Sequence, residues 1–153
     1  MEIQITQETP QIENQGLNQA LFEAVVTITN NIPAHQNLNI NLIKLAPGQA
    51  ELIMAIGSEF SNSYGTAHGG VIATFADSAM GVALRTLNLR VVTLEMNLNF
   101  FARVETGEKL IAKARSIHAG HQVIVAEADV YNSSNKLVSK SRGTFFRIGR
   151  VIE

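Results

Sequence analysis

Asp77 is the residue whose chemistry most needs an explanation, because it is a carboxylate within an apolar segment. It is the only charged side chain between Glu59 and Arg85. Residues 69–84 are otherwise apolar or small, which predicts a helix buried inside the protein. A buried carboxylate without a partner is costly, or it becomes neutral through a raised pKa. Asp77 is therefore either satisfied by a neighbouring donor or a subunit interface, or it is a catalytic base or nucleophile tuned toward neutral pH.

The helical neighbours of Asp77 favour the second interpretation. The residues about one turn before and after it are mostly small, so the carboxylate is expected to face a space that a ligand could fill. The opposite face of the helix carries an ordinary core stripe of apolar residues. The neighbours are Ala73, Thr74, Met80 and Gly81, and the core stripe is Ile72, Phe75, Ala76 and Ala79.

The turn His68-Gly69-Gly70 stands where a loop at 57–68 meets this helix. A helix start has free N–H groups and a partial positive charge, which suit a developing oxyanion, and glycines let a substrate approach the backbone. Gly69 and Asp77 are eight residues apart, which is about 12 Å along a helix. One reacting carbon cannot contact both. If the two groups act together, they must come from different subunits of a two-fold dimer, with antiparallel helices and two equivalent sites.

The first half of the chain predicts a surface helix and two strands. Apolar residues recur with helical spacing through 15–31, which predicts an amphipathic helix that ends at Pro33. Alternating residues at 38–42 predict a strand. A Pro-Gly turn at 47–48 then leads into a second short strand at 52–56.

The second half of the chain predicts an antiparallel sheet. Residues 92–100 alternate as a long strand, with the even-numbered residues on one face and Thr93 on the other. Small side chains on the next two strands let a helix approach the sheet closely. The fold class is therefore α+β, with one buried helix wrapped by a curved antiparallel sheet of about six strands. The further strands are expected at 110–115, 124–131 and 137–148, and the small residues are Ala112, Ala114, Ala126 and Ala128.

Composition bounds the class of protein. The chain has 153 residues, 46% hydrophobic and 16% charged, so a single domain over 1–153 is expected, with 1–14 as a polar lead-in. It contains no cysteine, which excludes disulfides, a thiolate nucleophile and cysteine-bound zinc, and fits a reducing compartment. No Lys or Arg precedes Lys44 and no long apolar run occurs, so neither a secretory signal nor a membrane-spanning helix is expected. These features predict a cytoplasmic protein without a membrane partner.

The charges are distributed unevenly along the chain. Residues 1–84 hold seven acidic residues and one basic residue, whereas residues 85–153 hold six acidic and eleven basic residues. The basic second half is typical either of a protein with an anionic partner, such as one that bears phosphate, or of ordinary solvated strand faces. Charge alone does not choose between the two.

Three other chemistries have weaker support in the sequence. The G-x-S-x-G motif is absent, and a triad of Ser63 and His68 with the helix aspartate would need unusual loop geometry. The glycines of 65–70 have the spacing of a nucleotide-binding loop, but the required Lys and Ser/Thr are missing. His118 and His121 flank a tight turn without an obvious third metal ligand, which favours two ordinary hairpin histidines.

The segment from Asn62 to Asp77 resembles the signature of hotdog-fold acyl-CoA thioesterases of the PaaI (phenylacetic-acid-degradation) type. In that family a His-Gly-Gly turn opens the central helix, and an acidic residue follows nine positions after the His. The resemblance continues through 97–100, 107–110 and 136–137 and covers about 38–148. Relatives usually have Pro where this chain has Val104, and the helix at 15–31 lies outside the matched core.

The resemblance implies a role for each site residue. Asp77 would be the catalytic carboxylate, which either activates water or attacks the thioester carbonyl. The Gly69 N–H would polarise that carbonyl from the opposite subunit, Asn62 would orient the water or leaving group, and His68 would hold the turn. The implied substrate-binding residues are Gly70, Thr93, Gly120, His121 and Gln122, the last three of them near the CoA entrance.

The resemblance therefore implies an enzyme that hydrolyses an acyl-CoA to a free acid and CoA. It implies no metal or other cofactor, since CoA is part of the substrate, and no nucleic-acid partner. The expected assembly is a homo-oligomer. It contains at least a dimer, and the full assembly is expected to be a homotetramer. The alternative is a hotdog module that binds or senses acyl-CoA without cleaving it, which burial of Asp77 against an Arg would favour. A hotdog dehydratase is disfavoured, because its paired His and acid are not recognisable.

Overall fold

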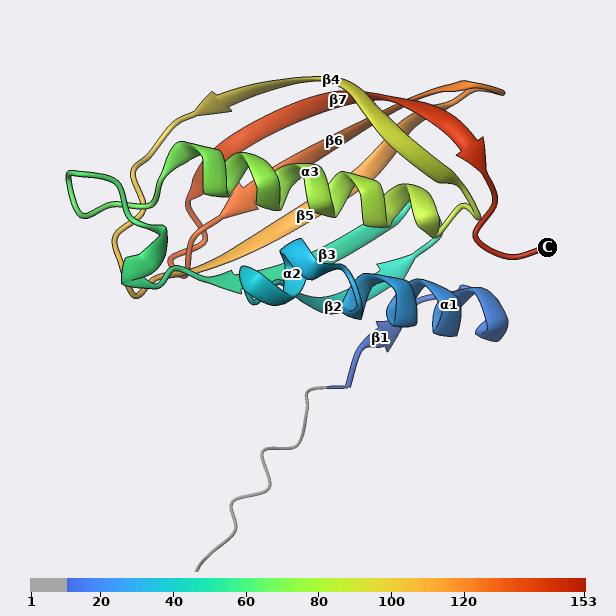
Figure 1. Cartoon of the computed structure of the whole chain (residues 1–153), viewed down its shortest axis with the longest axis horizontal. Helices are drawn as coiled ribbons and strands as arrows, with labels where there is room; N and C mark the ends of the chain where they lie inside the picture. Colours follow the sequence, from blue (N-terminus) through green and yellow to red (C-terminus); the bar gives the residue numbers. More distant parts are fainter. Residues whose placement is uncertain (1–10) are drawn as a thin grey trace, which may run out of the picture.

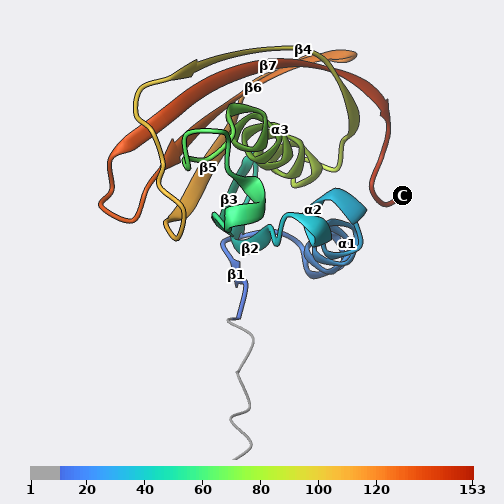
Figure 2. The ribbon, with the colours of Figure 1, turned by 60° about the vertical axis from the view of Figure 1, so that its left-hand side comes forward.

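The computed structural model describes residues 11–153, so most of the expected lead-in at 1–14 lies outside the described residues. One curved sheet wraps a central helix, α3 (Gly69–Arg85), as Figures 1 and 2 show. The expected α+β fold is confirmed. The other helices are α1 (Gln19–Asn30), α2 (Pro33–Asn37) and the short 3₁₀ helix η1 (Ser58–Phe60), and the strands are β1 (Glu13–Asn14), β2 (Asn41–Ala46), β3 (Gln49–Ala55), β4 (Arg90–Phe100), β5 (Lys109–Ala119), β6 (Val123–Tyr131) and β7 (Leu137–Gly149).

The sheet has seven strands in the order β1-β2-β3-β5-β6-β7-β4, rather than about six. The additional strand, β1, has two residues and pairs in parallel with β2, which is too short to leave a pattern in the sequence. All other pairs are antiparallel, as expected. β4 follows α3 in the chain and forms one edge of the sheet, next to β7.

The core lies between α3 and the concave face of the sheet. The stripe predicted for the helix is buried, and Met80 is buried with it rather than facing the space beside Asp77. The four alanines of β5 and β6 are buried beneath the helix, as their small size predicted. Ala50 of β3 pairs with Ala114, so the row of small side chains continues across the sheet. This row lets α3 lie close to the strands.

The N-terminal helix differs in detail from the prediction. It begins at Gln19 rather than near 15, because the Asn18 side chain accepts a hydrogen bond from the Leu21 N–H (3.1 Å) and caps the helix. Pro33 does more than end it: a proline fits the first turn of a helix, and here it opens α2. The strand expected at 38–42 therefore begins only at Asn41. The residues before it close α2 and turn the chain at Asn39, which has a φ of +52°.

The expected alternation along β4 is wrong around Leu94, where the strand has a bulge. Thr93 pairs with Phe145, but Glu95 pairs with Thr144, so one residue is inserted between them. The insertion moves Thr93 to the side of the sheet that faces α3, where it lies beside Met96. Glu95 is turned outward and accepts a hydrogen bond from the Thr144 hydroxyl (2.7 Å). A single bulge thus decides which side chain of β4 meets Asp77.

The open side of the curved sheet is covered by the two N-terminal helices. Figure 2, which looks along α3, shows α1 and α2 beside β2 where the sheet leaves the central helix uncovered. Val25 of α1 and His35 of α2 are buried there. Within residues 11–153, no helix is both long and apolar enough to cross a membrane.

Candidate active site

Asp77 is held by a hydrogen bond from β4. The Thr93 hydroxyl donates to Asp77 Oδ1 over 2.8 Å. The apolar neighbours of Asp77 had suggested that its carboxylate is deeply buried. In the single chain the carboxylate is instead only partly buried, and it has a hydrogen-bond partner. Among the described residues, no donor contacts Oδ2, which leaves this oxygen available to a ligand or a water molecule.

Open space lies beside Asp77, as the small helical neighbours predicted. Two cavities of about 330 and about 270 Å³ meet there, and both are lined by Thr74, Asp77 and Thr93. Gly81 lines the larger cavity, and a Cβ atom at this position would contact nothing within 4 Å. A carboxylate with one anchored oxygen at the junction of two cavities can act as a base or a nucleophile.

The first turn of α3 leaves one N–H free. His68 caps the helix, because its Nδ1 accepts a hydrogen bond from the Gly70 N–H (3.0 Å), while its carbonyl accepts from Val71 (3.0 Å). A neutral His68 therefore carries its proton on Nε2. No acceptor within residues 11–153 takes the Gly69 N–H, which remains available to polarise a carbonyl.

Asn62 organises the loop before the helix. Its Oδ1 accepts hydrogen bonds from the N–H groups of Tyr64 (2.9 Å) and Thr66 (3.2 Å), and its Nδ2 donates to the Thr66 hydroxyl (3.0 Å). Asn62 and Gly69 line one cavity of about 390 Å³ together with Phe100. Asp77 does not line this cavity, so a single chain places the two halves of the expected machinery in different cavities.

The hairpin residues expected to contact CoA lie apart from both Asp77 and Gly69. Gly120, His121 and Gln122 form the turn between β5 and β6, closed by the Gly120 N–H to the Val123 carbonyl (3.1 Å). They line none of the cavities at Asp77 or Gly69. Over the part of the chain that is described, no group of three or more His, Asp or Glu side chains is placed to hold a metal ion, so His118 and His121 lack a third ligand.

The chain is similar in sequence to known proteins. The thioesterase superfamily profile matches residues 64–139. The acyl-coenzyme A thioesterase PaaI of Escherichia coli K12 is 30% identical over 115 residues, which cover 75% of this chain and 82% of that protein. The chain belongs to the hotdog-fold acyl-CoA thioesterases of the PaaI type. Human acyl-coenzyme A thioesterase 13 is 27% identical over 133 residues, which cover 84% of this chain and 95% of the human protein.

Solved thioesterase structures superimpose on the chain. The structure of E. coli PaaI gives a TM-score of 0.83 at 26% identity, over 88% of this chain and 98% of that one. A thioesterase from Streptococcus pneumoniae TIGR4, solved with coenzyme A, gives a TM-score of 0.71 at 28% identity, over 73% of this chain and 90% of that one. These matches confirm the hotdog fold expected from the His-Gly-Gly turn.

Two residues that the sequence did not single out line the larger of the two cavities beside Asp77 in this thioesterase. They are His35 of α2 and Arg85 of α3, and Arg85 is the last residue of the helix that the His-Gly-Gly turn begins. Burial lowers the pKa of Arg85, and the Asp77 carboxylate partly opposes this effect. Burial and the nearby Arg85 charge lower the pKa of His35, which the Thr29 carbonyl and Asp77 partly oppose. The only feature of the sequence that could have pointed to Arg85 is that it is the next charged residue after Asp77 in the helix.

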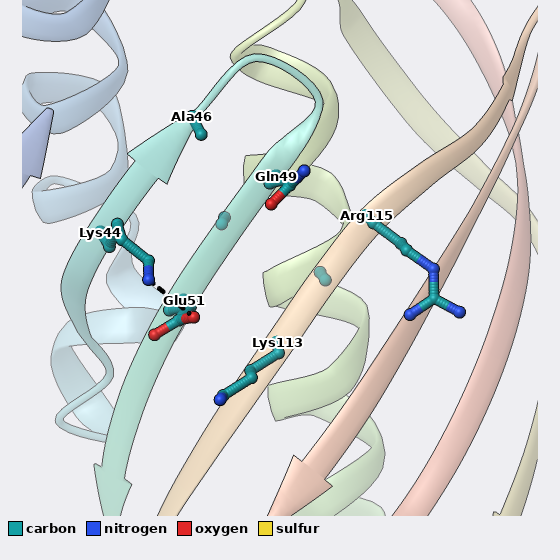
Figure 3. Close-up of a pocket in the computed structure, with 8 residues that line it drawn as sticks. Lys44, Ala46, Gln49, Glu51, Lys113 and Arg115 are labelled. Carbon is teal, nitrogen blue, oxygen red and sulfur yellow. Dashed lines mark ion pairs between the residues drawn. The ribbon is translucent and has the colours of Figure 1, made fainter. Parts of the chain in front are cut away.

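The convex face of the thioesterase carries a smaller cavity. Figure 3 shows Lys44, Glu51, Lys113 and Arg115 around it, on the side of β2, β3 and β5 that faces away from α3. Its volume is about 180 Å³. Lys44 forms an ion pair with Glu51 (3.1 Å), and Arg115 forms one with Glu127 of β6 (2.6 Å). Two of the three cationic groups here therefore have an acidic partner, while the Lys113 ammonium lies 5.5 Å from the centre of the Tyr131 ring.

Proposed function

We propose that this chain hydrolyses an acyl-CoA thioester to a free acid and CoA, at a site built by two subunits. The Asp77 carboxylate of one subunit and the Gly69 N–H of the other act on the same carbonyl. The observation that carries the proposal is the pairing of an anchored carboxylate in open space with a free N–H at the start of the same helix. The relatives named as acyl-coenzyme A thioesterases support this choice of substrate.

In the proposed reaction, Asp77 Oδ2 either takes a proton from water or attacks the thioester carbonyl itself. Addition of the oxygen makes an oxyanion, which the Gly69 N–H stabilises by a hydrogen bond. When water is the nucleophile, the C–S bond then breaks, the acid leaves with the new C–O bond, and the thiolate of CoA receives the proton taken from water. When Asp77 itself attacks, the C–S bond breaks to leave an anhydride between Asp77 and the acyl group. A water molecule then adds to the anhydride, which releases the free acid, restores the carboxylate and supplies the proton that the thiolate receives. Asn62 orients the water or the leaving group, while His68 holds the turn that aims the N–H.

The dimer follows from distance and from an exposed strand. Eight helical residues separate Gly69 from Asp77, or about 12 Å along the axis, so one carbonyl cannot reach both within a chain. β4 is an edge strand, and Leu94 and Phe100 on it are 58% and 51% exposed. An apolar, unpaired edge is expected to be covered by another chain. A second copy placed there also brings the second helix close to the first.

The remaining parts of the proposal concern CoA and higher assembly. Thr93 and Gly70 contact the acyl part of the substrate, and the β5–β6 hairpin at 120–122 of a subunit contacts the nucleotide or pantetheine. The S. pneumoniae thioesterase solved with coenzyme A supports CoA as the ligand of this fold. We further propose that dimers pair as a homotetramer and that the whole chain forms one cytoplasmic domain without a resident cofactor.

The test of the reaction is a panel of acyl-CoA thioesters assayed with a thiol-detecting dye. The wild type is expected to release CoA, and Asp77→Asn, which keeps the shape but removes the basic oxygen, should lower kcat by about 10²- to 10⁴-fold. Circular dichroism of both proteins controls for folding. Near-normal turnover by a folded Asp77→Asn variant would refute the role of Asp77.

The test of the shared site is subunit complementation. Gly69→Pro removes the N–H at a position where proline suits the helix start, and Gly69→Ala keeps the N–H while adding a Cβ near Phe100 (3.2 Å) as the control. A heterodimer of Asp77→Asn and Gly69→Pro chains, purified through two different tags, holds one intact site if the site is shared. It should recover about half of the wild-type turnover, whereas two inactive sites would show that each site is built within one chain.

The alternative is a module that binds acyl-CoA without cleaving it. Burial of Asp77 against an arginine would favour it, but the described residues contain no ion pair to Asp77. The two functions separate in a calorimetric titration of acyl-CoA. Tight binding with no release of thiol by the wild type would favour the module over the enzyme.

A further inference from the structure

The larger cavity beside Asp77 continues along α3 to Arg85. Its volume is about 330 Å³, and small groups of the helix, Ser78 and Gly81, keep it open between the two charged residues. Asp77 and Arg85 are eight residues apart, or about 12 Å along the axis. Helical side chains tilt toward the N-terminus of their helix, so the long Arg85 side chain leans back toward Asp77. An acyl chain whose carbonyl lies at Asp77 would therefore end near the Arg85 guanidinium.

Arg85 has no anionic partner of its own. Within residues 11–153 it forms no ion pair and its side chain forms no hydrogen bond, although it is partly buried. A guanidinium removed from water without a partner is costly, and the negative end of the helix offsets only part of that cost. Asp77 is near enough to act on Arg85 through space, but it is anchored by Thr93 instead.

His35 is a second polar residue that lines the same cavity. Its side chain is buried, with the residue only 4% exposed, and Nδ1 has no hydrogen-bond partner within residues 11–153. Buried polar atoms without a partner are rare in folded proteins. His35 comes from α2 and Arg85 from α3, so two elements bring polar side chains to one cavity. Figure 2 shows α2 on the open side of the sheet.

We propose that this end of the cavity binds a carboxylate at the far end of the acyl group, so that the preferred substrates are CoA thioesters of dicarboxylic acids. Arg85 presents a planar fork that matches a carboxylate. His35 lines the same cavity and adds a polar side chain from a second helix to this site. The apolar walls, formed by Ile32, Val91 and Phe145, hold the methylene groups between the two ends. This inference rests on the proposed hydrolysis at Asp77 and names its substrate class.

The test compares succinyl-, glutaryl- and adipyl-CoA with their monomethyl esters, which have nearly the same shape but no distal charge. For at least one chain length, kcat/KM of the wild type should be about 10- to 100-fold higher for the acid, as expected for a charge-assisted hydrogen bond. Arg85→Gln should abolish this ratio while hydrolysis of the methyl ester continues. Arg90→Gln, which removes an exposed charge of β4 outside the cavity, is the matched control and should keep the ratio.

The failure of this inference and the failure of the proposed hydrolysis give different results. If the wild type hydrolyses the methyl esters as well as the acids, and Arg85→Gln leaves the ratio unchanged, the carboxylate site is overturned and the thioesterase stands. If no thioester is hydrolysed, the same pairs are titrated calorimetrically into Asp77→Asn. Tighter binding of the acid, lost in the Asp77→Asn, Arg85→Gln double variant, would support the carboxylate site, and equal binding would overturn it.

Discussion

Charged groups on the two sides of the sheet differ in whether they have ion-pair partners. On the convex face, Glu127 is 8% exposed at its side chain and lies between Arg115 (2.6 Å) and Arg142 (3.1 Å to Nε). Asp129 is likewise paired with Lys140 (2.8 Å). On the concave side, the Arg85 guanidinium of α3 lines a cavity and has no ion-pair partner among the described residues. Charges that neutralise one another serve stability, whereas groups left unsatisfied beside a cavity are available to a ligand.

This contrast predicts that substitutions on the concave face change catalysis and those on the convex face change stability. The hydrogen bond from Thr93 to Asp77 gives the largest effect of the three substitutions below. Thr93→Val removes the donor while keeping the shape, and it should lower kcat about 10-fold, the value of one hydrogen bond to a charged group. The melting temperature should change little, since Thr93 is exposed in the single chain.

The measurement is steady-state hydrolysis beside thermal unfolding, with Thr93→Ser as the matched variant. Ser restores the hydroxyl, so it should recover most of the turnover. If Thr93→Ser and Thr93→Val lose the same activity, the hydroxyl is not the group that supports catalysis. That result would count against the idea that the concave side serves catalysis and the convex side serves stability.

Glu127 on the convex face provides the opposite result. The hydrogen bond from Arg142 is the main cause that holds the pKa of Glu127 below its ordinary value of 4.5, and burial partly opposes it. Glu127→Gln should lower the unfolding free energy by about 1 kcal/mol at pH 7, since its arginine partners are half-exposed and screened by solvent. The kcat should be unchanged.

The sign of the pH dependence follows from the direction of that shift. A carboxyl with a lowered pKa in the folded state contributes stability above its unfolded value, and this contribution is lost as the pH falls through the folded value. The wild type should therefore lose more stability below pH 4.5 than Glu127→Gln does. The free energy of unfolding of both proteins is measured between pH 3 and 7. The same loss of stability in the two proteins below pH 4.5 would contradict this prediction.

The smallest effect is expected for His35. Burial lowers the pKa of His35 from 6.5. Below pH 6.5, His35 therefore binds a proton more readily in the unfolded chain than in the folded chain. Stability should fall as the pH decreases from 7 through this window, and His35→Gln should flatten the fall. Chemical denaturation at several pH values measures it, with His121→Gln in the exposed hairpin as the control.

Much of this protein could be predicted from the spacing of its residues. The burial stripe of α3, the alanine faces of β5 and β6, and the Pro-Gly turn at 47–48 are local patterns with fixed periods, so they hold in the structure. The capping turn before α3 was also readable, since His68 and the glycines are consecutive. The roles assigned to Asp77, Gly69 and Asn62 remain predictions, which the variants above test.

Other features had no local signal. The side of β4 that carries Thr93 depends on a bulge that is defined only by pairing with β7. The second helix, α2, begins at a proline that on its own looked like a stop.

The sequence by itself determined a buried helix that starts at a glycine turn and carries one carboxylate, because helical periodicity and turn chemistry act between neighbouring residues. The tertiary structure alone decided that Thr93 holds Asp77 and that His35 joins Arg85 at one cavity. His35 and Arg85 are fifty residues apart in the chain. Only the packing of α2 against the open side of the sheet brings them together, and such packing leaves no period in the sequence.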